Sequence, residues 1–132
     1  MTLALWCVLL AGVLPLVWVG YAKATGGGYD NRAPRLFLAG VSGAAQRAHW
    51  AEQNSYEAFP LFAAGVLVAH YVGAPQGIVD LLAITFVAAR IGHGVCYLAD
   101  LATARSLAWV IGWVSSLALF LMGLWAPGAA VN

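Results

Sequence analysis

Hydrophobic residues fill four long stretches of the chain, and short polar segments separate them. Each stretch is about as long as the roughly 20 apolar residues that cross a bilayer. The pattern predicts an all-α membrane protein, a four-helix transmembrane bundle formed by one domain, residues 1–132, with helices at about 3–21, 43–73, 77–99 and 107–125. The connection between the second and third helices is only a few residues long, so these two helices are expected to be antiparallel neighbours.

The long connection between the first two stretches contains helix signals of its own. Pro34 suits the first turn of a helix, and Asp30 or Asn31 is placed to cap it. A helix continuous from Pro34 through the second stretch would be about 60 Å long, about twice the hydrocarbon thickness of a bilayer. Gly40 and Gly43 are the positions where so long a helix is expected to break.

Composition agrees with a membrane protein and excludes several other classes. The 132 residues are 63% hydrophobic and only 8% charged, whereas soluble domains carry roughly 25% charged residues. A net charge of +1 argues against a nucleic-acid partner. Cys7 and Cys96 lie in apolar runs, so neither a disulfide framework nor a metal site is expected. The uncharged N-terminal stretch is long enough to be a retained helix rather than a cleaved signal.

The basic residues are distributed unevenly between the two sides of the predicted bundle. Five of the six lie in or beside the first and third connections: Lys23, Arg32, Arg35, Arg47 and Arg105. The second connection and both termini carry none. The positive-inside rule therefore predicts cytoplasmic first and third connections, with both termini on the outer side.

Polar residues gather inside the second and third predicted helices. The second contains Arg47, His49, Glu52, Gln53, Asn54 and Glu57, and the third contains Arg90, His93, Tyr97 and Asp100. The four on the third helix follow spacings of three, four and three residues and fall within an arc of about 80°. A similar stripe runs along the second helix, and stripes on adjacent helices should face each other. Because Glu57 and Arg90 lie at comparable depths, we predict an ion pair between them.

This polar set allows two interpretations. A pair such as Glu57 and Arg90 can simply hold two helices together. The wider set, which adds Asn54, His93, Tyr97 and Arg105 along one stripe, favours an open polar pocket for an anionic or zwitterionic ligand.

Several residues outside the stripes have structural expectations. Asp80 is placed to cap the third helix, and His70 should lie at the outer interface. Gly92 and Gly94 are expected to permit close approach of helices. The tryptophans suit interfacial belts or lipid-facing surface: Trp6, Trp18, Trp109, Trp113 and Trp125.

Two segments carry a resemblance to a known family. Residues 54–62 read Asn-Ser-Tyr-Glu-Ala-Phe-Pro-Leu-Phe, and residues 90–98 read Arg-Ile-Gly-His-Gly-Val-Cys-Tyr-Leu. They resemble the N-x-x-E-x-F-P-L-F and R-x-x-H-x-x-x-Y patterns of the MAPEG family, the membrane-associated proteins of eicosanoid and glutathione metabolism. Arg105-Ser106 resembles the later Arg-Ser of the prostaglandin E synthase branch. The likeness covers nearly the whole chain, and residues 47–54 are most similar to bacterial members, which suggests a bacterial inner membrane.

The resemblance implies a homotrimer with glutathione sites between subunits, open to the cytoplasm. By position, Asn54 and Glu57 would hold the glutathione backbone and amino group, and Arg90 would orient Glu57. His93 and Tyr97 would line the site, and Arg47 is counted with this cofactor-binding set.

The catalytic residues implied by the resemblance are Arg105 and Ser106. A nearby guanidinium or hydroxyl would favour the thiolate, the nucleophilic form of a thiol. The implied function is a glutathione- or other thiol-dependent transferase or peroxidase that acts on lipophilic electrophiles.

Three departures from the family keep an alternative open. Trp50 and Gln53 stand where related enzymes carry arginine, and the segment between Tyr97 and Arg105 is one residue shorter than in the prostaglandin branch. The alternative is a non-catalytic trimer on the same scaffold that binds lipids or other ligands. A proton-coupled carrier is a third reading, disfavoured because the four helices show no inverted repeat.

Overall fold

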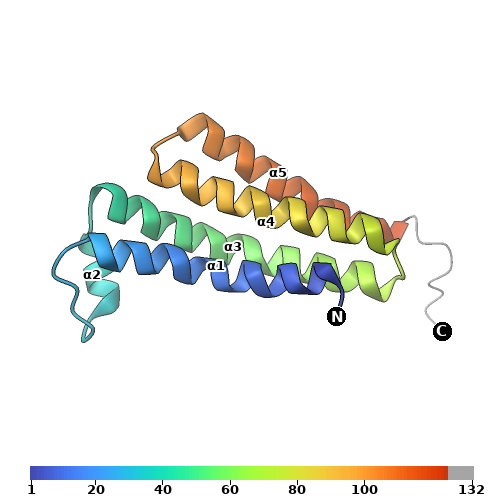
Figure 1. Cartoon of the computed structure of the whole chain (residues 1–132), viewed down its shortest axis with the longest axis horizontal. Helices are drawn as coiled ribbons and strands as arrows, with labels where there is room; N and C mark the ends of the chain where they lie inside the picture. Colours follow the sequence, from blue (N-terminus) through green and yellow to red (C-terminus); the bar gives the residue numbers. More distant parts are fainter. Residues whose placement is uncertain (125–132) are drawn as a thin grey trace.

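The protein is a set of long helices that lie side by side, as seen in a computed structural model that describes residues 1–124 (Figure 1). The long helices are α1 (Leu3–Thr25), α3 (Gly43–Tyr71), α4 (Gln76–Leu98) and α5 (Ala102–Leu121); the short ones are α2 (Pro34–Gly40) and the 3-10 turn η1 (Met122–Leu124). We call the end of the molecule that carries α2 the α2 end, and the end near the N-terminus the opposite end (Figure 1).

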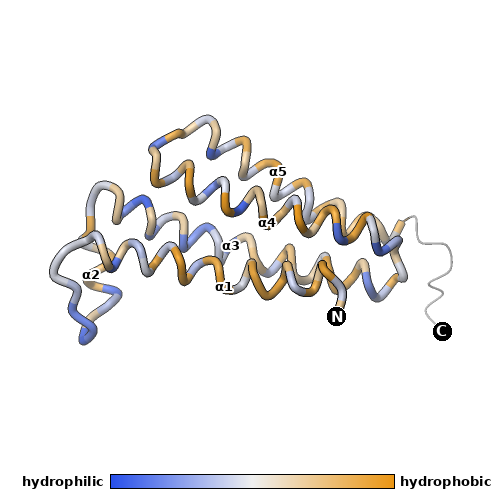
Figure 2. The backbone as a smooth tube through the Cα atoms, viewed as in Figure 1, coloured by the Kyte–Doolittle hydropathy of each residue, from blue (hydrophilic) through white to orange (hydrophobic). Residues whose placement is uncertain are grey.

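Three of the long helices, α1, α4 and α5, are long and apolar enough to cross a membrane. The exception among the predicted spans is α3. Its 29 residues make it about 44 Å long, but its polar residues lower its hydropathy. Hydrophilic positions gather in the half of the molecule nearer α2 and again at the opposite end (Figure 2). The second predicted span is therefore a helix at the expected position, but it is too polar to count among the helices that could cross a membrane by composition.

Close packing of small and aromatic side chains holds the long helices together. Helix α1 packs mainly on α3, and α5 mainly on α4. In the main core, Phe62 and Phe86 stack face to face with ring centroids 3.8 Å apart, and Leu119 is fully buried beside them. Buried alanines on α1, α3 and α4, such as Ala11 and Ala83, let the backbones approach.

Trp18 corrects one prediction and confirms another. It is 6% exposed, so its expected place in an interfacial belt is wrong. Its ring lies against the backbone of Gly94, where any Cβ would collide with it. Gly94 therefore permits the close approach that was predicted, whereas open space surrounds Gly92. Three other tryptophans are half-exposed as expected, namely Trp6, Trp109 and Trp113, and Trp125 lies outside the described residues.

A polar cluster closes the opposite end. The backbone N–H of Ala4 donates to Asp80 Oδ1 at 2.8 Å, and Gln76 Nε2 donates to the same oxygen. Asp80 therefore caps α1, and the prediction that it caps its own helix α4 is wrong. His70 Nδ1 donates to the Val66 carbonyl, so its Nε2 accepts from the Thr2 hydroxyl at 2.9 Å.

The helix that begins at Pro34 does not continue into α3. It is interrupted between Gly40 and Gly43, where a break was expected. Gly43 has φ +61°, a left-handed conformation that suits glycine and that no helix can pass through. Pro34 opens α2 as predicted, but no side chain caps that helix. The predicted capping by Asp30 or Asn31 is wrong, because Asp30 accepts from the Arg32 N–H within a turn of its own.

The last long helix begins earlier than expected. Helix α5 starts at Ala102 rather than near residue 107, because Asp100 adopts φ +60° and reverses the chain immediately after α4. Asp100 therefore lies beyond α4 and not on the polar stripe with which it was grouped. Arg105 and Ser106 consequently lie within the first turns of α5.

Candidate functional site

The two predicted polar stripes meet between α3 and α4. Arg90 is 2% exposed and extends from α4 towards α3. Its Nη2 donates to Asn54 Oδ1 at 2.9 Å and lies 3.5 Å from Ser55 Oγ and 3.4 Å from His93 Nδ1. One guanidinium thus joins two helices, as the helical spacing indicated.

The predicted ion pair between Glu57 and Arg90 does not form within residues 1–124. Asn54 lies between the two groups: its oxygen accepts from Arg90, and its Nδ2 donates to Glu57 Oε2 at 3.1 Å. The physical reason is register. Asn54 is level with Arg90, whereas Glu57 lies one turn further along α3 and its side chain is exposed. An amide that both donates and accepts can relay between a cation and an anion that do not touch.

The hydrogen bonding of His93 indicates which of its ring nitrogens carries the proton. An arginine guanidinium only donates, so the His93 Nδ1 beside Arg90 must accept. The ring proton is then on Nε2, and His93 offers a donor rather than a base. The ring is buried and meets the edge of Tyr97 with centroids 5.1 Å apart.

A cavity of about 410 Å³ opens beside this network. Helices α3, α4 and α5 all contribute to it, and its lining residues are Asn54, His93, Tyr97, Arg105, Ser106, Trp109 and Val110. Five of these seven were predicted site residues. Trp109 and Val110 were missed as lining residues, although Trp109 follows Arg105 by four positions and so shares its helix face.

Arg105 is the free cation of this cavity. Its guanidinium lies over the Tyr97 ring, 4.4 Å from the centroid, and the rings of Trp50 and Tyr97 lie with their centroids 6.4 Å apart. Arg105 forms no ion pair within the described residues. Its donors therefore remain available, held in place by a cation–π contact.

A second cavity has a volume of about 40 Å³. Glu57 and Arg90 line it together with Trp113 and Ser116. Trp109 lines both cavities, so one indole ring borders the cavity of Arg90 and Glu57 as well as the cavity of Arg105.

A family model, that of the MAPEG family, matches residues 3–125. The chain belongs to the MAPEG family. Its membership indicates a membrane protein related to glutathione and eicosanoid metabolism. No curated protein matches the chain significantly.

The MAPEG motif residues divide into two groups by their surroundings. Asn54, His93 and Tyr97 line the larger cavity, and Glu57 and Arg90 the smaller one. In the described part of this MAPEG chain, no group of three or more histidine, cysteine, aspartate or glutamate residues could hold a metal ion.

Two predicted site residues have hydrogen bonds that bear on their roles. Arg47 Nη2 donates to the carbonyl of Leu98 at 3.2 Å, where it satisfies the C-terminal end of α4, and it does not line the larger cavity. Its place in the cofactor-binding set stays a prediction. Ser106 lines the cavity, but its hydroxyl donates to the Ala102 carbonyl at 3.1 Å. The hydroxyl must rotate before it can donate to a ligand.

Proposed function

We propose that this protein is a thiol-dependent membrane transferase or peroxidase, with glutathione as co-substrate and lipophilic electrophiles as second substrates. The observation that carries the proposal is Arg105, a cation that has no ion-pair partner within residues 1–124 and is held over Tyr97 at a cavity of about 410 Å³. Cavities of this size accommodate ligands of a few hundred daltons.

The charges around the two cavities complement those of glutathione. Glutathione carries two carboxylates and one ammonium group, and the site offers two guanidiniums, Arg90 and Arg105, and one carboxylate, Glu57. Asn54 and the Nε2–H of His93 add neutral hydrogen-bonding groups. The buried Nε of Arg90 has no partner within the described residues, so the site has a donor to spare for a bound anion.

The proposed chemistry depends on stabilising a thiolate. Bound glutathione supplies the sulfur nucleophile, and a free thiol of this type has a pKa of about 8.5. Arg105 would stabilise the negative charge on the sulfur, and Ser106 would add a hydrogen bond once its hydroxyl turns away from Ala102. Trp109 and Val110 provide the apolar wall against which a lipophilic electrophile would rest.

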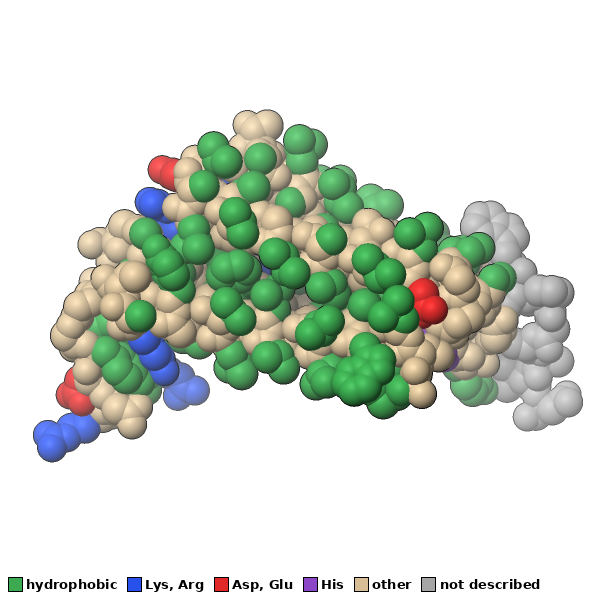
Figure 3. Space-filling model, viewed as in Figure 1, with side chains coloured by type: hydrophobic (Ala, Val, Ile, Leu, Met, Phe, Trp, Pro, Cys, Tyr) green, Lys and Arg blue, Asp and Glu red, His purple; other side chains and the backbone are tan. Residues whose placement is uncertain are grey.

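Glu57 supports a homotrimer. It lies halfway along α3 and is exposed in the single chain, yet an ionised carboxylate at membrane depth costs a few kcal/mol unless protein covers it. A neighbouring subunit would supply that cover, and the cavities would then lie at the subunit interface. Basic side chains project at the α2 end (Figure 3), which we place in the cytoplasm of a bacterial inner membrane, with both termini outside.

The test is turnover by the purified protein. A generic aromatic halide and a lipid hydroperoxide are each supplied with glutathione, and product is measured for the wild type, Arg105→Ala and the control Arg32→Ala, whose side chain is exposed and lines neither cavity. The wild type and the control should turn over, and Arg105→Ala should lose about a hundredfold in rate. Absence of activity with every low-molecular-weight thiol would overturn the proposal.

The alternative function is a trimer that binds lipids or other ligands without catalysis. The hydrogen bond from Ser106 to Ala102 favours it, because the hydroxyl proton is turned away from the cavity. Trp50 and Gln53 also lack the charge that related enzymes have at these positions. Ligand binding without turnover, unchanged in Ser106→Ala, would support this alternative.

A further inference from the structure

Gly112, which is buried within α5, has no steric reason to be a glycine. A Cβ at this position would lie 3.6 Å from Arg90 Cδ and 3.7 Å from the Phe86 ring, which are ordinary van der Waals distances. Its φ is not positive, and glycine inside a helix is less favourable than alanine. Since Gly112 lines the second cavity, an alanine there would mainly reduce the volume of that cavity.

The second cavity has room for a water molecule. Its volume is about 40 Å³, and a water needs at least about 10–15 Å³. A methyl group at position 112 would take up part of this space, because Arg90 and Phe86, which the methyl would contact, line the same cavity. Cavities that stay dry are lined by apolar groups alone, whereas charged side chains line this one.

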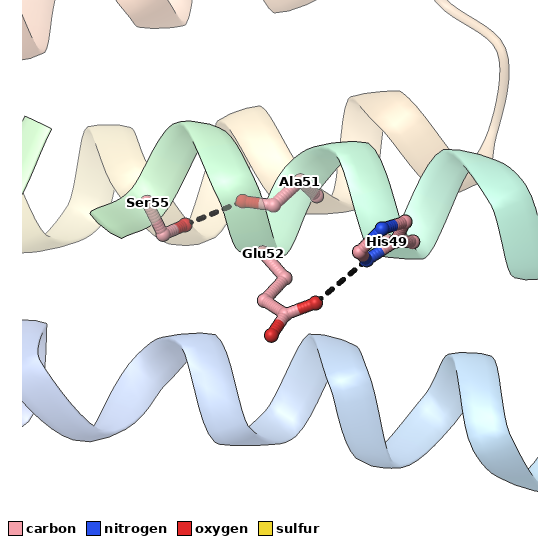
Figure 4. A network of polar contacts seen from close by, with 4 residues as sticks. All are labelled: His49, Ala51, Glu52 and Ser55. Carbon is pink, nitrogen blue, oxygen red and sulfur yellow. Dashed lines mark hydrogen bonds and ion pairs between the residues drawn. The ribbon is translucent and has the colours of Figure 1, made fainter. Parts of the chain in front are cut away.

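One donor of the buried Arg90 guanidinium lies beside this cavity. The hydrogens of Nη2 are directed to Asn54 Oδ1 and Ser55 Oγ. The Ser55 oxygen is left to accept because its own proton goes to the Ala51 carbonyl at 2.7 Å (Figure 4). The Nε of Arg90 is buried without a partner within residues 1–124. It is bonded to Cδ, the atom nearest to the Cβ position of Gly112, so its donor belongs to the cavity.

Two acceptors line the same cavity. Glu57 accepts from Asn54 through Oε2, and its other carboxylate oxygen forms no hydrogen bond in the described part of the chain. The Ser116 hydroxyl donates to the Gly112 carbonyl at 3.1 Å, so its oxygen keeps lone pairs with which to accept. One donor and two acceptors match the roughly three hydrogen bonds that a buried water makes.

We propose that this cavity binds a water molecule that bridges Arg90 to Glu57. The water accepts from Arg90 Nε and donates to the second carboxylate oxygen of Glu57 and to Ser116. The cation and the anion, which do not touch, are then joined twice, once through Asn54 and once through water. The donor that Arg90 can spare for a bound anion is presented through this water. Gly112 keeps the space for it, and the neighbouring subunit that covers Glu57 in the proposed homotrimer shields it from lipid.

The first experiment detects the water in the purified protein. The arginines are labelled with ¹⁵N, and the Nε–H resonance of Arg90 is assigned by its loss in Arg90→Lys. Its cross peak to water is recorded in the rotating frame, where direct contact and chemical exchange give opposite signs. We expect a cross peak with the sign of direct contact. Its absence would overturn the proposal, and this is also the result if a side chain of the neighbouring subunit fills the cavity.

Gly112→Ala tests whether the water lies in the cavity. The methyl should displace the water, so the contact cross peak should be lost. The midpoint of thermal unfolding should fall, because Arg90 Nε is left buried and unpaired. Gly20→Ala is the matched control, since Gly20 is an exposed residue within α1 with open space around its Cβ position. The control should keep the cross peak and should not lower the midpoint. A Gly112→Ala protein that keeps the cross peak, or that is stabilised like the control, would contradict the bridge.

A last measurement rests on the proposed function, in which Glu57 binds the ammonium group of glutathione. The bridge would hold Glu57 in place, so Gly112→Ala should weaken glutathione binding about tenfold, the equivalent of one hydrogen bond to a charged group, and Gly20→Ala should bind as the wild type. Water at Arg90 in a protein that binds no glutathione would support the bridge and count against the proposed function. Wild-type affinity in a Gly112→Ala protein that has lost its water would overturn the role of the bridge in holding Glu57.

Discussion

The two ends of the molecule handle polar groups inside an apolar chain in opposite ways. At the opposite end, two hydrogen bonds shorter than 3 Å join the start of α1 to other helices. The Ala4 N–H donates to Asp80 of α4, and the Thr2 hydroxyl donates to His70 of α3. In the half nearer α2, Arg90 has an unpartnered Nε within the described residues, and Arg105 has no ion pair there. Both cavities of the candidate site lie beside this incomplete set. We therefore expect the polar residues at the opposite end to serve stability alone, and those of the half nearer α2 to serve the proposed ligand site as well.

The comparison predicts how substitutions divide between stability and function. In the closed cluster at the opposite end, a lost side chain should cost stability and leave ligand binding intact. In the candidate site, losing a side chain that has hydrogen-bond partners in the protein should lower both stability and function. Losing a side chain without such partners should lower function alone.

Arg90→Met should have the largest effect on stability. The substitution leaves Asn54 Oδ1 and His93 Nδ1 without their donor in a buried setting, so we expect the free energy of unfolding to fall by about 3 kcal/mol. Glutathione binding should be lost as well. Thermal unfolding in detergent and equilibrium binding measure the two effects, with Arg32→Met as control. A variant of wild-type stability would show that the network does not fasten α3 to α4.

Asp80→Ala should come next. It leaves the fully buried Ala4 without an acceptor for its N–H, which should cost about 2 kcal/mol. Asp80→Asn keeps Oδ1 and should cost much less, as measured by the shift in the unfolding midpoint. Glutathione affinity should be unchanged in both variants. A loss of affinity in Asp80→Ala would contradict the division between the two ends.

Thr2→Val removes the hydroxyl that joins α1 to His70 without changing the shape of the side chain. We expect a loss of about 1 kcal/mol in unfolding free energy. Thr25→Val is the matched control, because the Thr25 hydroxyl only donates to Tyr21 within its own helix and is exposed, and its substitution should be neutral. Equal shifts in the two variants would mean that the hydroxyl of Thr2 contributes nothing across helices.

Arg105→Gln should have the smallest effect on stability. Within the described residues the substitution removes the cation–π contact with Tyr97 and no ion pair, so the free energy of unfolding should change by less than about 1 kcal/mol. Turnover should fall as in Arg105→Ala. A large drop in the unfolding midpoint would place Arg105 among the residues that fasten helices, and would weaken the case for a thiolate site.

Much of the fold and of the site could be predicted from the sequence because helical spacing determines which polar residues share a face. Asn54, His93 and Tyr97 were assigned to one polar site on this basis, and they do line one cavity. Arg105 belonged to the same predicted polar set, and the family motifs added Ser106; both line the same cavity.

What could not be predicted depends on rotation and on contacts between distant segments. Helix α1 is apolar on nearly all sides, so no pattern indicated that Trp18 faces inwards. The capping of α1 by Asp80 joins positions 76 residues apart. The relay through Asn54 depends on a difference of one helical turn between Glu57 and Arg90, which is finer than the depth comparison that predicted their ion pair.

The contact of Trp18 with Gly94 has a consequence for how this protein can evolve. Since a methyl group at position 94 would overlap the indole, position 94 can take a side chain only if the residue at position 18 is smaller. Relatives that carry a side chain in place of Gly94 should therefore carry a smaller residue in place of Trp18, and the two columns of a family alignment should vary together. Relatives that keep both residues should also keep the axial alignment of α1 against α4, and with it the depth of His93 in the membrane.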